Sequence, residues 1–176
     1  PVAEQMFRES GFYEHVAAST AIGPQPSNML LHYTTNNRVE NIVARDAARL
    51  AVKHVFGDGR RLPPVYETLI ECMANTNNHA SLSRRGSYDW WLSVYNDPKA
   101  PRSVFTFLDL GVGVFRSLPV QRFWTSVAQK LGISRNVDLV PQLFAGEISS
   151  RTGQSERGKG IPRIHEHATG GTFRSA

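Results

Sequence analysis

The fold that we expect for this chain follows mainly from residues 87–113, SYDWWLSVYNDPKAPRSVFTFLDLGVG. Residues 87–95 and Ser103–Asp109 are both rich in aromatic and β-branched side chains, which favour strands. Asn96-Asp97-Pro98 lies between them and is typical of a turn. The stretch therefore predicts two strands that pair in antiparallel fashion.

Helical patterns flank this strand pair on both sides. Apolar residues repeat at helical spacing over 38–56, and again over 64–82 after two prolines. Shorter patterns predict a strand at 29–33 and a helix at 161–167. Strands and helices interleaved in this order indicate an α+β fold.

Composition limits the class of protein. The chain has 176 residues, of which 40% are hydrophobic and 20% charged. These values suit one globular domain over 1–176 and exclude a disordered, collagen-like or coiled-coil chain. The sequence does not begin with Met, and 172–174 resembles a strand that has just begun. We therefore expect a fragment of a longer chain, or a domain that lacks its last strand or strands.

Cysteine content and charge limit the partners and the compartment. Cys72 is the single cysteine, which excludes an intramolecular disulfide and a cysteine zinc cluster. We expect a small buried side chain at Cys72, a cytoplasmic protein, no signal peptide and no membrane partner. The net charge of +5 suits an anionic ligand or simply a soluble basic surface. The chain contains no run of five like charges, so we do not expect a charged tail that binds nucleic acid.

The first candidate motif lies on the predicted helix 64–82. Glu71 and Asn75 are four residues apart, so they share one face of the helix, and Asn78 and His79 extend this polar stripe. A carboxylate can deprotonate a water molecule, and a carboxamide oxygen is a ligand that Mg²⁺ accepts. The same spacing also suits an ordinary solvated helix face. We interpret His79 as a structural hydrogen-bonding residue.

The second motif ends the strand Ser103–Asp109. Alternation places Phe105, Phe107 and Asp109 on one face of the strand, and the two Phe predict that this face is buried against helices. A buried aspartate needs a hydrogen-bond donor, and the exocyclic amine of adenine is one candidate. Gly111 and Gly113 would allow a sharp turn and the close approach of a ligand. An ordinary turn at a strand end has the same pattern.

The third motif opens the short helix at 161–167. Gly158, Lys159 and Gly160 would bring backbone N–H groups and a positive charge to a bound phosphate. A flexible basic loop before a helix has the same composition. The spacing is not that of a P-loop.

The order of these motifs resembles the GHKL superfamily of ATPases and kinases, which includes gyrase, heat-shock chaperones, histidine kinases and mismatch-repair ATPases. The resemblance covers residues 64–171. It implies a two-layer α/β sandwich of the Bergerat type, with a mixed, mostly antiparallel sheet covered by helices on one face.

The resemblance also implies roles for single residues. Asn75 would bind Mg²⁺, Glu71 would activate the water that hydrolyses ATP, and Asp109 would bind the adenine amine. Two glycine motifs would adjoin the nucleotide, one as a hinge and one around the phosphates: Gly111 and Gly113, then Gly158, Lys159 and Gly160.

The chain departs from the family pattern in two places. The family's late threonine has no secure match here, since Thr172 lies near the end of the chain. The lid region between Arg116 and Arg157 is long and has room for an extra helix.

These observations favour Mg²⁺-dependent ATP binding and hydrolysis, with closure of the lid as a conformational switch. One alternative is a kinase domain that phosphorylates a histidine on a partner chain. His165-Glu166 is not expected to be that acceptor, because it follows the glycine motif, and we interpret these histidines as surface residues. A second alternative binds ATP without hydrolysis.

The expected partners are ATP and either another protein or further domains of a longer chain, and a homodimer is compatible with the family. Direct binding of nucleic acid on an aromatic platform is disfavoured. Alternation along the strand puts Trp90 and Trp91 on opposite faces of the sheet.

Overall fold

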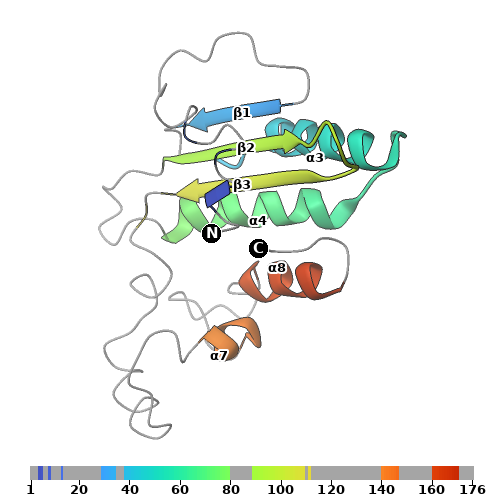
Figure 1. The fold of residues 1–176 in the computed structure, drawn as a ribbon. Coiled ribbons are helices and arrows are strands. Elements are labelled where there is room, and N and C mark those ends of the chain that lie inside the picture. The colour runs from blue at the N-terminus through green and yellow to red at the C-terminus, as the bar shows by residue number, and fades with distance from the viewer. Residues whose placement is uncertain are drawn as a thin grey trace, which may run out of the picture.

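The computed structural model describes five continuous parts of the chain, the single residue 111 and a few isolated N-terminal residues (Figure 1). For 29–34, 78 and 79 it describes the backbone alone. The described residues are 4, 5, 8, 13, 29–34, 38–79, 89–109, 111, 140–146 and 160–170.

Among the described residues, three antiparallel strands form the sheet, in the order β1-β2-β3. They are β1 (Met29–Thr34), β2 (Trp90–Asn96) and β3 (Ser103–Asp109). Trp90 pairs with Thr34 on one side and with Asp109 on the other. The predicted strand pair and the predicted first strand are thus confirmed. The predicted residues 87 and 88 lie outside the described part.

The hairpin between β2 and β3 is closed by Asp97. Its Oδ1 accepts the Lys99 backbone N–H at 2.9 Å, and its Oδ2 accepts Arg102 Nη2 at 2.7 Å. The Asp97 backbone N–H donates to the Arg102 carbonyl. This self-contained turn fixes the register of the two strands, as expected for an Asx-type turn.

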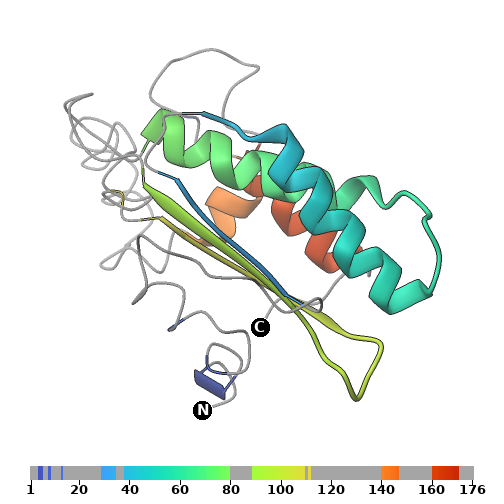
Figure 2. The same ribbon diagram turned by 90° about the horizontal axis from the view of Figure 1, so that it is seen from above.

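The helices lie on one side of the sheet, which Figure 2 shows nearly edge-on. They are α3 (Asn41–Phe56), α4 (Pro63–His79), α7 (Val140–Phe144) and α8 (Gly160–Thr169). Helix α4 lies between α3 and α8, and α7 contacts α8. The prediction of α3, α4 and α8 is confirmed. The sequence also predicts a helical stretch at about 115–131, which lies outside the described residues.

The core lies between α3, α4 and the sheet. Small alanines on α3 let this helix approach the strands closely, which buries the larger side chains of β2 and α4. The fully or almost fully buried cluster consists of Ala44, Ala47, Ala51, Leu69, Met73, Trp90, Leu92 and Val94. Such dense packing holds α4 rigidly against the sheet.

The pairing of β2 with β3 defines the two faces of the sheet. Trp90 stacks on Phe107 with 5.4 Å between ring centroids on the face that α3 and α4 cover. Trp91 belongs to the opposite face and is 6% exposed, and Ser93 on that face is completely buried. The prediction that the two tryptophans lie on opposite faces is confirmed, so they form no shared platform for bases.

The architecture is therefore a mixture of helices with a small antiparallel sheet, an α+β fold. Within the described ranges, none of the helices has the length and apolar character needed to cross a membrane.

Candidate functional site

Helix α4 carries the first motif on the side that turns away from the core. Leu69 and Met73 point into the core, with exposed fractions of 3% and 0%. Glu71 and Asn75 are half-buried and lie beside the first residue of α8. The predicted shared face is confirmed, and the element that this face meets is α8.

Gly160 brings the third motif onto the first. It is the first residue of α8 and is buried. A Cβ at this position would lie 2.6 Å from Glu71 Oε2 and 3.3 Å from both polar atoms of the Asn75 carboxamide. Only glycine lets the start of α8 come this close without displacing a side chain. The carboxylate also lies at the positive end of the α8 dipole, which favours a negative charge there.

An ion pair closes the contact between α4 and α8. Arg163 Nη1 donates to Glu71 Oε1 at 3.0 Å. The Glu71 side chain is 24% exposed and that of Arg163 is 48% exposed. Both oxygens of Glu71 are therefore adjacent to α8, one at Arg163 and the other at Gly160.

A second set of polar contacts joins α8 to α4 near the end of α8. His167 Nδ1 lies 3.2 Å from Thr68 Oγ1, and His167 Nε2 lies 3.6 Å from Glu67 Oε2. The His167 side chain is only 14% exposed. These contacts hold the end of α8 against α4, as Arg163 and Gly160 do at its start.

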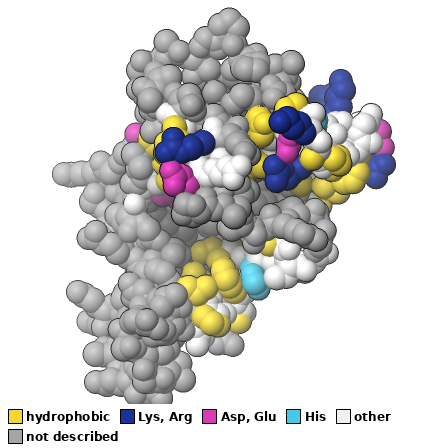
Figure 3. All heavy atoms as spheres, in the orientation of Figure 1, with side chains coloured by type: hydrophobic (Ala, Val, Ile, Leu, Met, Phe, Trp, Pro, Cys, Tyr) yellow, Lys and Arg dark blue, Asp and Glu magenta, His cyan; other side chains and the backbone are white. Residues whose placement is uncertain are grey.

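Two histidines of α8 correct the sequence interpretation, which placed them on the surface. His165 and His167 are both half-buried. The His165 ring stacks on Phe144 of α7 with centroids 4.3 Å apart and an angle of 3° between planes. The sequence pattern of α8 alone did not reveal the neighbouring helices that cover these rings. Figure 3 shows the hydrophobic side chains gathered over α7 and α8.

Asp109 also corrects an expectation. It occupies a register position on the helix-covered face, as predicted, but its side chain is exposed, whereas Phe105 and Phe107 are half-buried. Asp109 is the last residue of β3, so the packing on the two Phe ends before it. Its Oδ1 accepts the Gly111 backbone N–H at 2.8 Å and orders the start of the following turn.

Cys72 follows Glu71 on α4 and is half-buried. Burial, with smaller contributions from the charges of Asp109 and Glu71, raises the pKa of its thiol to about 12. A thiol that stays protonated at neutral pH is a poor nucleophile. The small side chain that the sequence predicts to be buried is therefore partly buried, and its raised pKa disfavours a nucleophilic role.

Other predicted site residues fall outside the described part of the chain. They are Gly113, Gly158 and Lys159, together with Thr172 and the side chains of Asn78 and His79. Of the lid region between Arg116 and Arg157, the structure describes 140–146, which includes α7. The expectation of an extra helix in this region is confirmed at α7.

One residue of the site had no place in the sequence interpretation. Arg163 was not selected, although it lies three residues after Gly160 and thus on the same side of its helix. For α7, the sequence interpretation allowed an extra helix in the lid region but did not give its position. Pro141 near its start and Gly146 after its end are ordinary helix boundary signals, and Gly146 has a φ of +73°.

The arrangement offers acceptors, donors and hard oxygen ligands together. Glu71 and Asn75 supply a carboxylate and a carboxamide at the start of α8, and Asp109 supplies an exposed carboxylate at the end of β3. The oxygens of Glu71 and Asn75 are of the type that Mg²⁺ prefers, so the residues present fit this ion.

Comparison of the chain with protein-family models, with curated proteins and with solved structures gives no match.

Proposed function

We propose that this chain binds ATP with Mg²⁺ and hydrolyses it as a GHKL-type domain, in which the sheet and the helices form a two-layer sandwich. One observation carries the proposal. Glu71 and Asn75 of the first motif lie in contact distance of Gly160 of the third motif, although the two motifs are far apart in the sequence. A nucleotide site of this family requires such a meeting.

The start of α8 is suited to the phosphates. Backbone N–H groups at a helix N-terminus favour anions, and Gly160 lets them approach closely. The Glu71 carboxylate lies beside this helix start, and this supports the proposal that negative charge is favourable there. Asn75 would hold Mg²⁺ beside the phosphates, and the ion when bound would neutralise part of their charge.

Glu71 is the proposed base for hydrolysis. Its carboxylate would take a proton from a water molecule, and the water oxygen would attack the terminal phosphorus of ATP. The bond from that phosphorus to the ADP oxygen would break, which yields ADP and phosphate. The short distance from Glu71 to the start of α8 keeps the base close to the proposed position of the phosphates.

Asp109 is the proposed adenine ligand. Its Oδ1 already accepts the Gly111 N–H, so its remaining acceptor capacity is available to an exocyclic amine. The exposure of Asp109 leaves a ligand free to approach it. A carboxylate that accepts from the exocyclic amine of adenine would select adenine over guanine, because guanine carries a carbonyl oxygen in place of that amine.

Calorimetric titration of the chain with ATP and with GTP, each with and without Mg²⁺, tests the binding. We expect binding of ATP that Mg²⁺ strengthens, and rejection of GTP. Equal binding of both nucleotides would contradict the role of Asp109, and binding of neither would contradict the proposed function.

Turnover tests the base. Glu71→Gln keeps the size of the side chain but removes the proton acceptor, so we expect ATP binding to persist and turnover to fall by about 10²- to 10⁴-fold. Phosphate release under excess ATP is the measurement. A Glu71→Gln chain with the turnover of the original would show that Glu71 is not the base.

The ion pair between Glu71 and Arg163 also favours a second candidate, an ATP-binding switch that hydrolyses slowly. One oxygen of the Glu71 carboxylate already accepts from the Arg163 guanidinium, so fewer acceptor positions remain for an attacking water molecule. This candidate predicts tight ATP binding with turnover that a partner protein must stimulate. Turnover by the isolated chain distinguishes the two.

A further inference from the structure

Arg163 forms an ion pair with Glu71, the proposed base. Its guanidinium reaches from α8 to Glu71 Oε1 at 3.0 Å. It follows Gly160 by one helical turn, so both residues lie on the side of α8 that faces α4. Gly160 and Arg163 therefore act on the same carboxylate from one helix.

These two contacts define where the carboxylate lies. Oε1 is held by Arg163, and Oε2 is limited by the backbone at Gly160. A glutamate side chain has several rotatable bonds and loses considerable conformational freedom when it is fixed. Without Arg163, the end of the Glu71 side chain would lack the one charged partner that the structure defines for it.

We propose that Arg163 is a positioning residue for ATP hydrolysis, which acts through Glu71 and holds its carboxylate beside the start of α8. The inference rests on the proposed function. The planar guanidinium can offer two parallel N–H groups to a carboxylate, which fixes orientation as well as distance. An ammonium group in its place would retain the charge and lose that geometry.

Arg163 is not the only polar link between α8 and α4. Thr68 and Glu67 contact His167 near the other end of α8. These contacts are independent of the guanidinium. A change at Arg163 can therefore affect the carboxylate without releasing the helix.

The experiment is a double-mutant cycle in the full chain. The proteins are the original, Arg163→Ala, Glu71→Gln and the double variant, with kcat, KM and the Kd for Mg·ATP measured on each. We expect Arg163→Ala to lower kcat by about 10- to 100-fold, as misplacement of a catalytic group does. The Kd should change by less than about twofold, because the proposed role is in the chemical step.

The cycle identifies the route of the effect. If Arg163 acts through Glu71, its removal adds nothing once Glu71 is Gln. Arg163→Lys should recover part of the lost kcat. Additive losses in the double variant, or a loss confined to the Kd, would overturn the inference. Should Arg163→Ala fail to fold, Arg163→Gln decides in its place, because it retains length and removes the charge.

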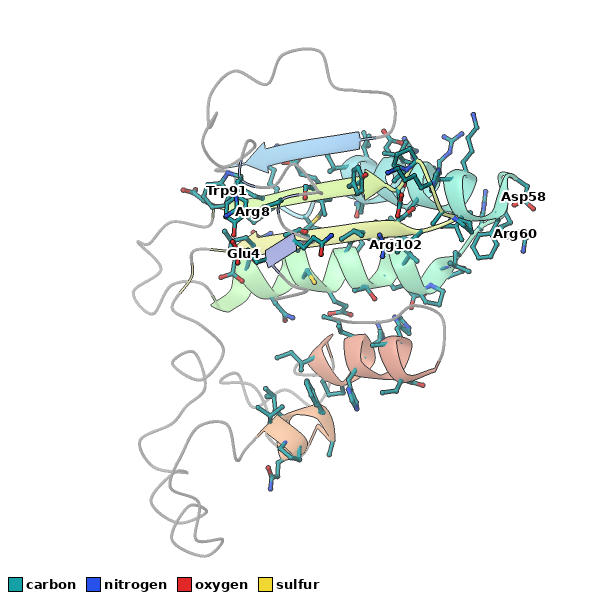
Figure 4. All side chains as sticks on the ribbon, viewed as in Figure 1. Glu4, Arg8, Asp58, Arg60, Trp91 and Arg102 are labelled. Carbon is teal, nitrogen blue, oxygen red and sulfur yellow. The ribbon has the colours of Figure 1, made fainter. Side chains whose placement is uncertain are left out.

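A matched control is Arg60→Ala. Arg60 pairs with Asp58 at 2.6 Å, and the change in net charge is the same. The pair lies in the connection between α3 and α4, well separated from α8 (Figure 4). Its removal should leave kcat unchanged. An equal loss of kcat in this control would show a general effect of charge and overturn the inference.

A second readout needs no nucleotide. Urea unfolding of the four proteins should show that the two substitutions are not additive in the unfolding midpoint, because each removes the same ion pair. If the original chain hydrolyses ATP and Arg163→Ala does so at the same rate, the positioning role alone is overturned. Absence of ATP binding or turnover in the original chain would overturn the proposed function and this inference together.

Discussion

Asp109 shows how a single residue combines a local and a distant task. One oxygen orders the turn after β3 through Gly111, and the side chain as a whole is exposed, so the carboxylate remains open to a ligand. The turn needs only an acceptor, whereas the proposed adenine contact needs an acceptor that is ionised. The two tasks can therefore be separated by substitution.

Asp109→Asn should weaken ATP binding and leave the fold intact. The amide oxygen can still accept the Gly111 N–H, while the charged acceptor is lost. A hydrogen bond to a charged group contributes about 1.5–3 kcal/mol, so we expect the Kd to rise by about 10- to 100-fold. Asp46→Asn, an exposed change of equal charge on α3, is the control for calorimetry. Unchanged affinity in Asp109→Asn would contradict the adenine assignment.

Gly160 is the residue at which backbone geometry bears most directly on the site. A Cβ there would lie 2.6 Å from Glu71 Oε2. That oxygen is the end of a flexible side chain, so the side chain would move before the helices separate. The cost therefore falls on the position of the carboxylate more than on stability.

Gly160→Ala should consequently lower turnover with little loss of stability. The helix propensity of Ala, up to about 1 kcal/mol better than that of Gly, offsets part of the crowding. We expect an unfolding midpoint close to the original and a kcat reduced by about tenfold or more. Gly59→Ala is the control, since nothing lies within 4 Å of its Cβ. A normal kcat in Gly160→Ala would show that the carboxylate does not need its observed position.

Among the elements, the end of helix α3 is determined by the residues next to it in the sequence. It ends at Gly57 with a φ of +73°, and the Gly57 N–H donates to the Lys53 carbonyl at 2.9 Å. A side chain in this left-handed conformation is strained, whereas glycine is not. Lys53 and His54 in the last turn complement the helix dipole.

Gly57→Ala should destabilise the fold by about 1–2 kcal/mol, the cost of a left-handed non-glycine residue. The measurement is urea unfolding followed by circular dichroism. Gly59→Ala again serves as the control, because no positive φ is found there and its surroundings are open. Equal midpoints for the two variants would contradict the strain argument.

At the scale of the whole molecule, α4 connects the core to the site. One of its sides places Met73 in the core at 0% exposure, and the other presents Glu71 and Asn75 to α8. The core between α3, α4 and the sheet therefore determines the position of the proposed catalytic face. A loosened core should disturb both stability and the site.

Met73→Ala tests this coupling. Removal of a fully buried Met should destabilise the protein by about 2–5 kcal/mol, because it loses apolar burial and leaves a cavity. Urea unfolding is the measurement. Ile42→Ala on α3 is the control, since Ile42 is 65% exposed and its loss should be within about 0.5 kcal/mol. Similar losses for both variants would mean that Met73 is not packed as described.

The sequence by itself determined the elements and their order. The strand pair, α3, α4 and α8 follow from local periodicity, turn residues and glycines, which act over short distances in the chain. The shared face of Glu71 and Asn75 follows from helix geometry alone. The exposure of Asp109 was missed, since alternation predicts a face but not how far along a strand the helices extend.

Only the tertiary structure decided which elements meet. Three contacts join segments that are distant in the sequence: Gly160 with Glu71, Glu71 with Arg163 in an ion pair, and His165 stacked on Phe144. No local pattern encodes these contacts, because they depend on how α4, α7 and α8 pack after each helix has formed. Local sequence therefore determines the helices and strands of the proposed site, and tertiary packing determines which of them contact one another.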